Sequence, residues 1–147
     1  MKAPTFLGYE REDGTVGTRN YVAVIPTVFC ANEVVTDIAK GFTLCRPLLH
    51  NSGCGQLKPD LEMVTKTLIG LGLNPNAGAT LLVGLGCEST DLQAVYEGIK
   101  SGGRWVEKLT IHGSGGMTNA VEEGRRIVSQ MEEALLKQKR MPHPASE

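Results

Sequence analysis

The sequence lacks an excess of charge of either sign. Its 147 residues carry 15 Lys and Arg against 16 Asp and Glu, and the basic residues are scattered along the chain. A nucleic-acid surface needs clustered Lys and Arg to bind phosphates. The composition therefore predicts no nucleic-acid partner.

Long apolar runs are missing as well. The longest runs fall far short of the ~20 residues that cross a bilayer, so we expect no membrane-spanning segment. The first residues, MKAPTFLGYERED, contain no apolar region typical of a secretory signal. We therefore expect a cytoplasmic protein, and a length of 147 residues suits a single domain.

The four cysteines include no CxxC pair, which argues against a standard zinc knuckle. Without an export signal, such cysteines are more typical of free thiols or metal ligands than of disulfides. We expect them to be reduced.

What the sequence does contain is a regular alternation of apolar and amphipathic segments. Each apolar segment is followed by one with the spacing of a helix; the predicted strands are 21–28, 43–50, 79–86 and 105–112. This alternation is typical of a parallel sheet covered by helices on both faces. We predict an α/β fold, a Rossmann-like three-layer domain with a mainly parallel sheet of about four strands.

Local signals set the boundaries of this domain. Pro47 interrupts the second strand and predicts that it lies at the sheet edge, and Asn32 is a candidate N-cap for the first helix. We expect residues 1–20 to form an irregular or hairpin lead-in, residues 21–138 the Rossmann-like domain, and residues 139–147 an unstructured tail.

Residues that can bind metals or move protons follow each predicted strand; they are Cys30, His50, Cys54, Cys87 and His112. The carboxyl ends of parallel strands meet at one edge, where ligands bind in such sheets, so we expect these residues to converge. Thiolates and imidazoles suit iron or zinc. A shared metal site and a set of small buried side chains both stay open. We interpret Cys45, which lies inside a strand, as a buried side chain.

The remaining polar candidates also have two interpretations. His50 and His112 each close a strand, where a histidine either bonds to a backbone carbonyl or acts as a ligand or general acid/base. Arg11, Arg19 and Lys58 could pair with a substrate carboxylate. Lys58 is more typical of solvated surface.

The loop 113–116 could hold an anion on its backbone N–H groups as it leads into a helix. Its sequence, GSGGMTNA, matches neither a Walker loop nor a dinucleotide fingerprint, and GLGCES lacks a third glycine. These mismatches argue against a nucleotide-binding domain, which stays open as a further class.

Several motifs in order resemble the altronate/galactarate dehydratase family, also called altronate hydrolase or UxaA-like. They are GYEREDGTVGTRNYVAVIPTVFCAN, HNSGCGQ, TLIGLGLNPN and LLVGLGCE, and the resemblance covers about residues 6 to 130. It implies a hydro-lyase that removes water from a sugar acid to give a 2-keto-3-deoxy acid and depends on ferrous iron. A sulfolactate sulfo-lyase branch belongs to the same superfamily.

The resemblance also implies partners. It identifies the chain as the N-terminal domain of a large subunit, with a small SAF-type domain upstream or in a partner subunit, and with MPHPASE as a linker toward a large C-terminal domain. We expect a homo-oligomer and an inactive isolated chain, although a natural short protein stays an alternative.

Within this resemblance, we expect Cys54 and Cys87, then Cys30, to bind iron. His50 is the candidate acid/base or a further ligand, and Arg19 is the candidate carboxylate clamp. Gln56, Gly115 and Gly116 complete the expected substrate contacts. The competing interpretation is a non-catalytic Rossmann-like module for binding or assembly.

Overall fold

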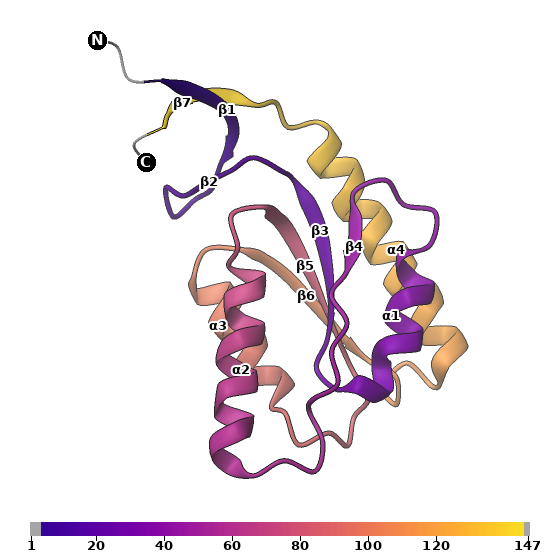
Figure 1. The fold of residues 1–147 in the computed structure, drawn as a ribbon. Coiled ribbons are helices and arrows are strands. Elements are labelled where there is room, and N and C mark those ends of the chain that lie inside the picture. Colours follow the sequence, from indigo (N-terminus) through magenta and orange to yellow (C-terminus); the bar gives the residue numbers. More distant parts are fainter. Residues whose placement is uncertain (1–3, 146–147) are drawn as a thin grey trace.

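A four-stranded parallel sheet in the order β4-β3-β5-β6 forms the centre of the computed structural model (Figure 1). Residues 4–145 are described; residues 1–3 of the predicted lead-in and 146–147 of the predicted linker lie outside that part. The strands are β3 (Tyr21–Pro26), β4 (Cys45–Pro47), β5 (Ala77–Gly84) and β6 (Trp105–Thr110). Each is followed in turn by one of the helices α1 (Asn32–Ala39), α2 (Lys58–Gly72), α3 (Leu92–Ser101) and α4 (Met117–Leu136). The predicted α/β class and element order are confirmed.

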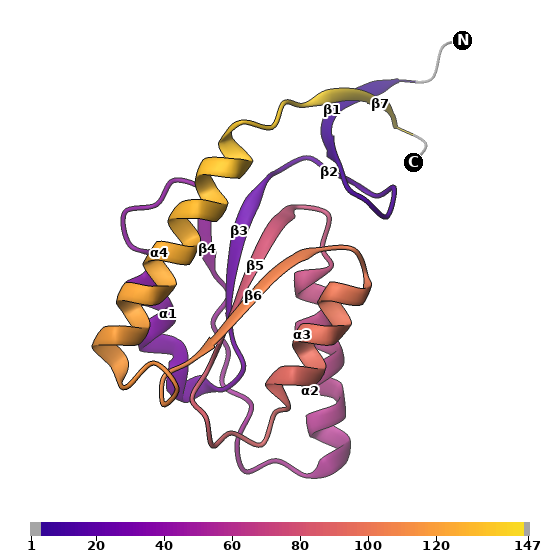
Figure 2. The ribbon, with the colours of Figure 1, turned by 180° about the vertical axis from the view of Figure 1, so that it is seen from behind.

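Helices cover both faces of the sheet, as Figures 1 and 2 show. Val22 and Val24 of β3 pack with α1 and α4 on one face, whereas Ala23 and Ile25 pack with α2 and α3 on the other. Alternate residues of β3 are therefore buried on opposite faces, which explains its continuous apolar sequence. Within residues 4–145, no helix is long and apolar enough to cross a membrane.

Strand β4 lies at the sheet edge, as Pro47 predicts, and spans three residues. Cys45 is 4% exposed, which confirms its interpretation as a buried side chain. The predicted cap of α1 is wrong: Ala31 occupies the N-cap position, with no side-chain cap.

A second, antiparallel sheet in the order β2-β1-β7 lies beyond the amino ends of the main strands, near both termini (Figure 1). Strands β1 (Thr5–Glu10) and β2 (Val16–Gly17) form a hairpin, which is one of the two forms expected for the lead-in. The expected unstructured tail is wrong, because β7 (Met141–Pro144) pairs with β1. Its two prolines weaken the local strand signal, and an edge strand tolerates them. A role as linker to a further domain stays a prediction.

Two buried arginines attach the hairpin to the main sheet. Arg11 donates to the carbonyl of Pro75, which precedes β5, at 2.8 Å. Arg104, which precedes β6, pairs with Asp13 of the hairpin at 3.0 Å. The hairpin is therefore fixed at the amino-end edge of the sheet.

Two helical glycines test how the α1–α4 layer packs. A Cβ at Gly124 of α4 would lie 2.3 Å from Cδ1 of the fully buried Ile38 of α1, whereas a Cβ at Gly70 of α2 would meet nothing within 4 Å. We expect Gly124→Ala to lower the free energy of unfolding by about 1–3 kcal/mol through overpacking. Gly70→Ala should raise it by about 0.5–1 kcal/mol. Urea denaturation measures both, and a Gly124→Ala variant as stable as Gly70→Ala would contradict the described packing.

Candidate functional site

The chain leaves β3 and β5 in opposite directions at their carboxyl ends. The connection after β3 leads through α1 to β4 on one side, and the connection after β5 leads through α3 to β6 on the other. Such a switch point opens a crevice at the carboxyl edge of a parallel sheet, which is where ligands bind in these folds. We take this edge, called the rim below, as the candidate site.

Backbone hydrogen bonds join three rim loops. The amide of Phe29, after β3, donates to the carbonyl of Ser52 at 2.9 Å. The amide of Ser89, after β5, donates to the carbonyl of Gly53 at 3.0 Å. The loop that follows β4 therefore bridges the loops on either side of the switch point.

Gly53 makes this bridge possible. Its φ of +106° lies in the left-handed region, and a Cβ there would lie 2.3 Å from the carbonyl oxygen of Thr27 and 2.7 Å from Cα of Val28. A residue without a side chain is required at such an approach of two backbones. This contact explains why glycine precedes Cys54 in the loop.

The bridge brings the thiol-bearing loops to one edge. Cys30, Cys54 and Cys87 follow β3, β4 and β5 respectively, and all three are exposed free thiols. Cys45 is buried, and burial, helped by the charge of Glu132, raises the pKa of its thiol to about 11. The rim thus carries accessible thiols, while the thiol inside the sheet is neutral.

Iron binding by these thiols stays a prediction. Among residues 4–145, no group of three or more His, Cys, Asp or Glu side chains is arranged to hold a metal ion. The described residues therefore do not form a complete iron site, and we assign no chemical step to iron.

His50 is bonded to the backbone at both ring nitrogens. Nε2 lies 2.6 Å from the carbonyl oxygen of Pro26, and Nδ1 lies 3.1 Å from the amide of Ser52. Because an amide can only donate, Nδ1 accepts and Nε2 carries the proton that it donates to Pro26. The carbonyl of His50 in turn accepts from the Asn32 side chain at 2.9 Å. This geometry favours the structural interpretation of His50, and an acid/base role stays a prediction.

The glycine loop after β6 uses its own amide donors. The N–H groups of Gly113, Ser114, Gly115 and Gly116 all donate to acceptors within residues 110–112. His112 is exposed and lies beside Gly86, where a Cβ would be 2.8 Å from its Nδ1. These contacts do not support anion binding by the four amides, and substrate contacts of Gly115 and Gly116 stay a prediction.

The remaining predicted substrate contacts do not meet at the rim. Arg19 precedes β3, so it lies at the opposite edge of the sheet, where its side chain donates to the carbonyl of Thr18 at 3.2 Å. Arg11 belongs to the hairpin, and its side chain donates to the carbonyls of Pro75 and Arg19 at the same far edge. Gln56 lies at the rim, but its Oε1 accepts from the amide of Gly53 at 2.7 Å and closes the loop. The structure therefore separates Arg19 from the thiols.

Glu88 is a rim residue that the sequence analysis did not single out. Its carboxylate accepts hydrogen bonds from the Thr27 hydroxyl at 2.7 Å and the Gly86 amide at 2.6 Å. Partial burial raises the pKa of this carboxyl, but the hydrogen bonds outweigh burial and lower the pKa overall. The sequence feature that could have identified Glu88 as a rim residue is its position directly after GLGC, at the end of a predicted strand.

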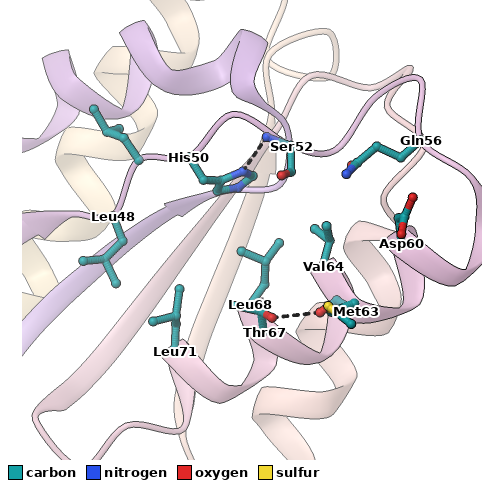
Figure 3. Close-up of a pocket in the computed structure, with 11 residues that line it drawn as sticks. Leu48, His50, Ser52, Gln56, Asp60, Met63, Val64, Thr67, Leu68 and Leu71 are labelled. Atoms are coloured by element: carbon teal, nitrogen blue, oxygen red, sulfur yellow. Dashed lines mark hydrogen bonds between the residues drawn. The ribbon is translucent and has the colours of Figure 1, made fainter.

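A cavity lies on the β4 side of the rim, between the segment after β4 and helix α2 (Figure 3). It has a volume of about 570 Å³, and its lining is mostly apolar, including Leu48, Leu68 and Leu71. His50 lines it as well, with both ring nitrogens already bonded. Its polar lining comes from Ser52, Gln56, Asp60 and Thr67.

Thiol labelling tests the burial pattern of the cysteines. We expect three cysteines per chain to react rapidly with a disulfide reagent in the native protein, because Cys30, Cys54 and Cys87 are exposed. Cys45 should react only on unfolding, since its thiol is buried and neutral. Cys45→Ala is the control and should keep three rapid thiols. Four thiols reacting at one rate would contradict this arrangement.

His50 and His112 each follow a strand, so the same substitution at both positions compares a bonded histidine with an exposed one. We expect His50→Ala to lower the free energy of unfolding by about 1–3 kcal/mol, because it removes the partners of Pro26 and Ser52. His112→Ala should change it by less than about 0.5 kcal/mol, since this side chain is exposed. Chemical denaturation compares them, and equal stability would remove the structural role of His50.

Comparison with known proteins gives a family. Residues 8–135 match the model of the "D-galactarate dehydratase/Altronate hydrolase, second domain" family. An altronate dehydratase of Bacillus subtilis (strain 168) is 31% identical, over 97% of this chain and 30% of the relative. The beta subunit of a (2R)-sulfolactate sulfo-lyase of Chromohalobacter salexigens is 35% identical, over 87% of this chain and 33% of the relative.

A galactarate dehydratase (L-threo-forming) of Escherichia coli (strain K12) is 28% identical, over 67% of this chain and 21% of the relative. The chain thus spans a third or less of the length of these relatives. The family model covers most of its length, including every strand of the main sheet and all four rim loops. The chain therefore belongs to the D-galactarate dehydratase/altronate hydrolase family, in which it corresponds to the second domain.

Proposed function

We propose that this chain is a domain of a sugar-acid dehydratase and that its rim forms part of the active site. The complete enzyme would remove water from an aldonate or aldarate, such as altronate or galactarate, to give a 2-keto-3-deoxy acid. The observation that carries the proposal is the gathering of three exposed thiol-bearing loops at the switch point, in a chain of this family. Switch points are the usual ligand sites of such sheets.

The reaction needs groups that the rim does not supply alone. A base must take the proton from C2, which the adjacent carboxylate makes acidic, and an acid must assist the departing hydroxyl at C3. His50 has both ring nitrogens bonded to the backbone, and Glu88 accepts three hydrogen bonds. We therefore propose that residues from other parts of the enzyme take part in proton transfer, with His50 as the candidate from this chain.

The partners of this domain are also part of the proposal. They are ferrous iron bound through Cys54, Cys87 and Cys30, a small SAF-type domain or subunit, a large C-terminal domain, and further copies in a homo-oligomer. The length of the relatives, of which this chain spans a third or less, supports a site built by several domains. We propose a cytoplasmic location for the enzyme.

A second reaction is favoured by one specific relative. The similarity to a (2R)-sulfolactate sulfo-lyase subunit supports elimination of sulfite from a sulfonated acid as the alternative. Both reactions remove a leaving group from the carbon next to an acidic C–H, so the same rim serves either. Assays of sulfite and of 2-keto-3-deoxy acid on the same samples separate them, and activity in neither favours a non-catalytic assembly module.

The activity of the short chain and of the complete enzyme tests this proposal. We expect the 147-residue chain alone to show no turnover of altronate or galactarate with ferrous iron, because a misplacement of reacting groups by ~1 Å can cost about a hundredfold. A protein that also contains the C-terminal domain, supplied with the SAF-type partner, should form the 2-keto-3-deoxy acid. Robust turnover by the short chain would refute a site built by several domains.

In that complete enzyme, we expect Cys54→Ser to lower iron content and turnover together, because a hydroxyl is a poorer iron ligand than a thiolate. Cys45→Ala removes a buried thiol and should leave the iron content unchanged. Full iron and full activity in Cys54→Ser would remove this residue from the metal site.

A further inference from the structure

One carboxylate joins the two sides of the switch point. Oε1 of Glu88 accepts from the Thr27 hydroxyl at 2.7 Å and from the Leu85 amide at 3.2 Å, and Oε2 accepts from the Gly86 amide at 2.6 Å. Thr27 is fully buried at the end of β3, whereas Leu85 and Gly86 follow β5. The side chain therefore links two loops that diverge from the switch point.

The two amides form an anion-binding nest. Consecutive backbone N–H groups that point into one concavity bind phosphates and carboxylates in many proteins. The amides of Leu85 and Gly86 donate to the same carboxylate, and Gly86, with a φ of +121°, begins the turn that leads to Glu88. In α/β folds this position is where a ligand's charged group is bound. Here the anion in the nest belongs to the chain itself.

Gly84 leaves room for this carboxylate. A Cβ at Gly84 would lie 2.4 Å from Oε1 of Glu88 and 3.3 Å from the Thr27 hydroxyl. Any side chain at Gly84 would displace Glu88 from the nest. The glycine at the end of β5 and the acidic residue four positions later therefore act as one unit.

We propose that the Glu88 carboxylate is an internal anion that fills the switch-point nest, closes it to nucleotide phosphates, and positions the Cys87 loop against the loop of Cys30. The role in positioning rests on the proposed function, whereas occupation of the nest does not. One consequence is that a substrate carboxylate must be bound by donors other than the Leu85 and Gly86 amides.

Replacement by alanine should open a site for a free carboxylate. Glu88→Ala removes the group that fills the nest, and acetate has the size of the missing part. We expect the Tm of Glu88→Ala to be about 4–8 °C below that of the unmodified domain. Sodium acetate should raise the Tm of this variant saturably relative to equal sodium chloride, and should not affect the unmodified domain in this way.

Three controls separate occupation of the nest from general destabilisation. Glu88→Gln keeps the volume but presents an amide donor to the nest, so its Tm should fall without a response to acetate. Gly84→Ala should behave in the same way, because the carboxylate is displaced but still attached. If Glu88→Ala does not fold, Thr27→Val tests the same contact, because it keeps the volume of the buried side chain but removes the hydroxyl donor, so its Tm should fall.

Three results would overturn occupation of the nest. One is a Glu88→Ala variant with an unchanged Tm. Another is an equal acetate response in Glu88→Ala and the unmodified domain. The third is a Thr27→Val variant with the Tm of the unmodified domain.

Steady-state kinetics of the complete enzyme test the positioning role. Glu88→Ala should lower kcat about 100-fold with KM for the sugar acid nearly unchanged, and acetate should restore part of kcat. Thr27→Val should lower kcat similarly, because it breaks the same contact. If Glu88 instead acted as a general base, Thr27→Val would keep nearly full activity. Full kcat in Glu88→Ala would refute positioning. An acetate-dependent Tm in a protein with no dehydratase activity would instead support the nest and count against the proposed function.

Discussion

Strands β3 and β5 pair at the centre of the sheet although α1, β4 and α2 separate them in the chain. The pairing runs from Tyr21 opposite Ala77 to Pro26 opposite Val83, so both strands end at the same level. The rest of the architecture depends on it: β4 and β6 add at the outer sides, and the connections diverge over opposite faces. This divergence makes the carboxyl ends of β3 and β5 the switch point of the sheet, where ligands bind in such folds.

The rim is held together by backbone contacts more than by side chains. Gly53 packs against Thr27 and Val28, and its carbonyl accepts from the loop after β5. His50 and Glu88 reinforce these contacts: His50 donates to the carbonyl of Pro26, and Glu88 accepts from the Thr27 hydroxyl. The polar side chains with the most contacts at the rim are therefore structural, which leaves the exposed thiols as the groups available to a metal or substrate.

The sequence predicted the strand–helix order, the edge position of β4 and the burial of Cys45, because period and composition report directly on burial. It missed β7, whose partner β1 lies at the other end of the chain. It also missed Glu88 and placed Arg19 in the site, because hydrogen bonds across loops and the edge on which a residue lies depend on three-dimensional distances. Gly53 directly precedes Cys54 in the sequence, but only the structure shows which backbone it approaches.

The central claim is that a sugar acid binds at the carboxyl-end rim of this domain in the complete enzyme. Hydrogen–deuterium exchange with and without galactarate or altronate tests it most directly, since exchange reports on each loop separately. The account predicts that the ligand slows exchange in residues 27–31, 50–57 and 85–90. Protection that avoids these loops and appears at the amino-end edge, in residues 11–20 and 73–77, would contradict it.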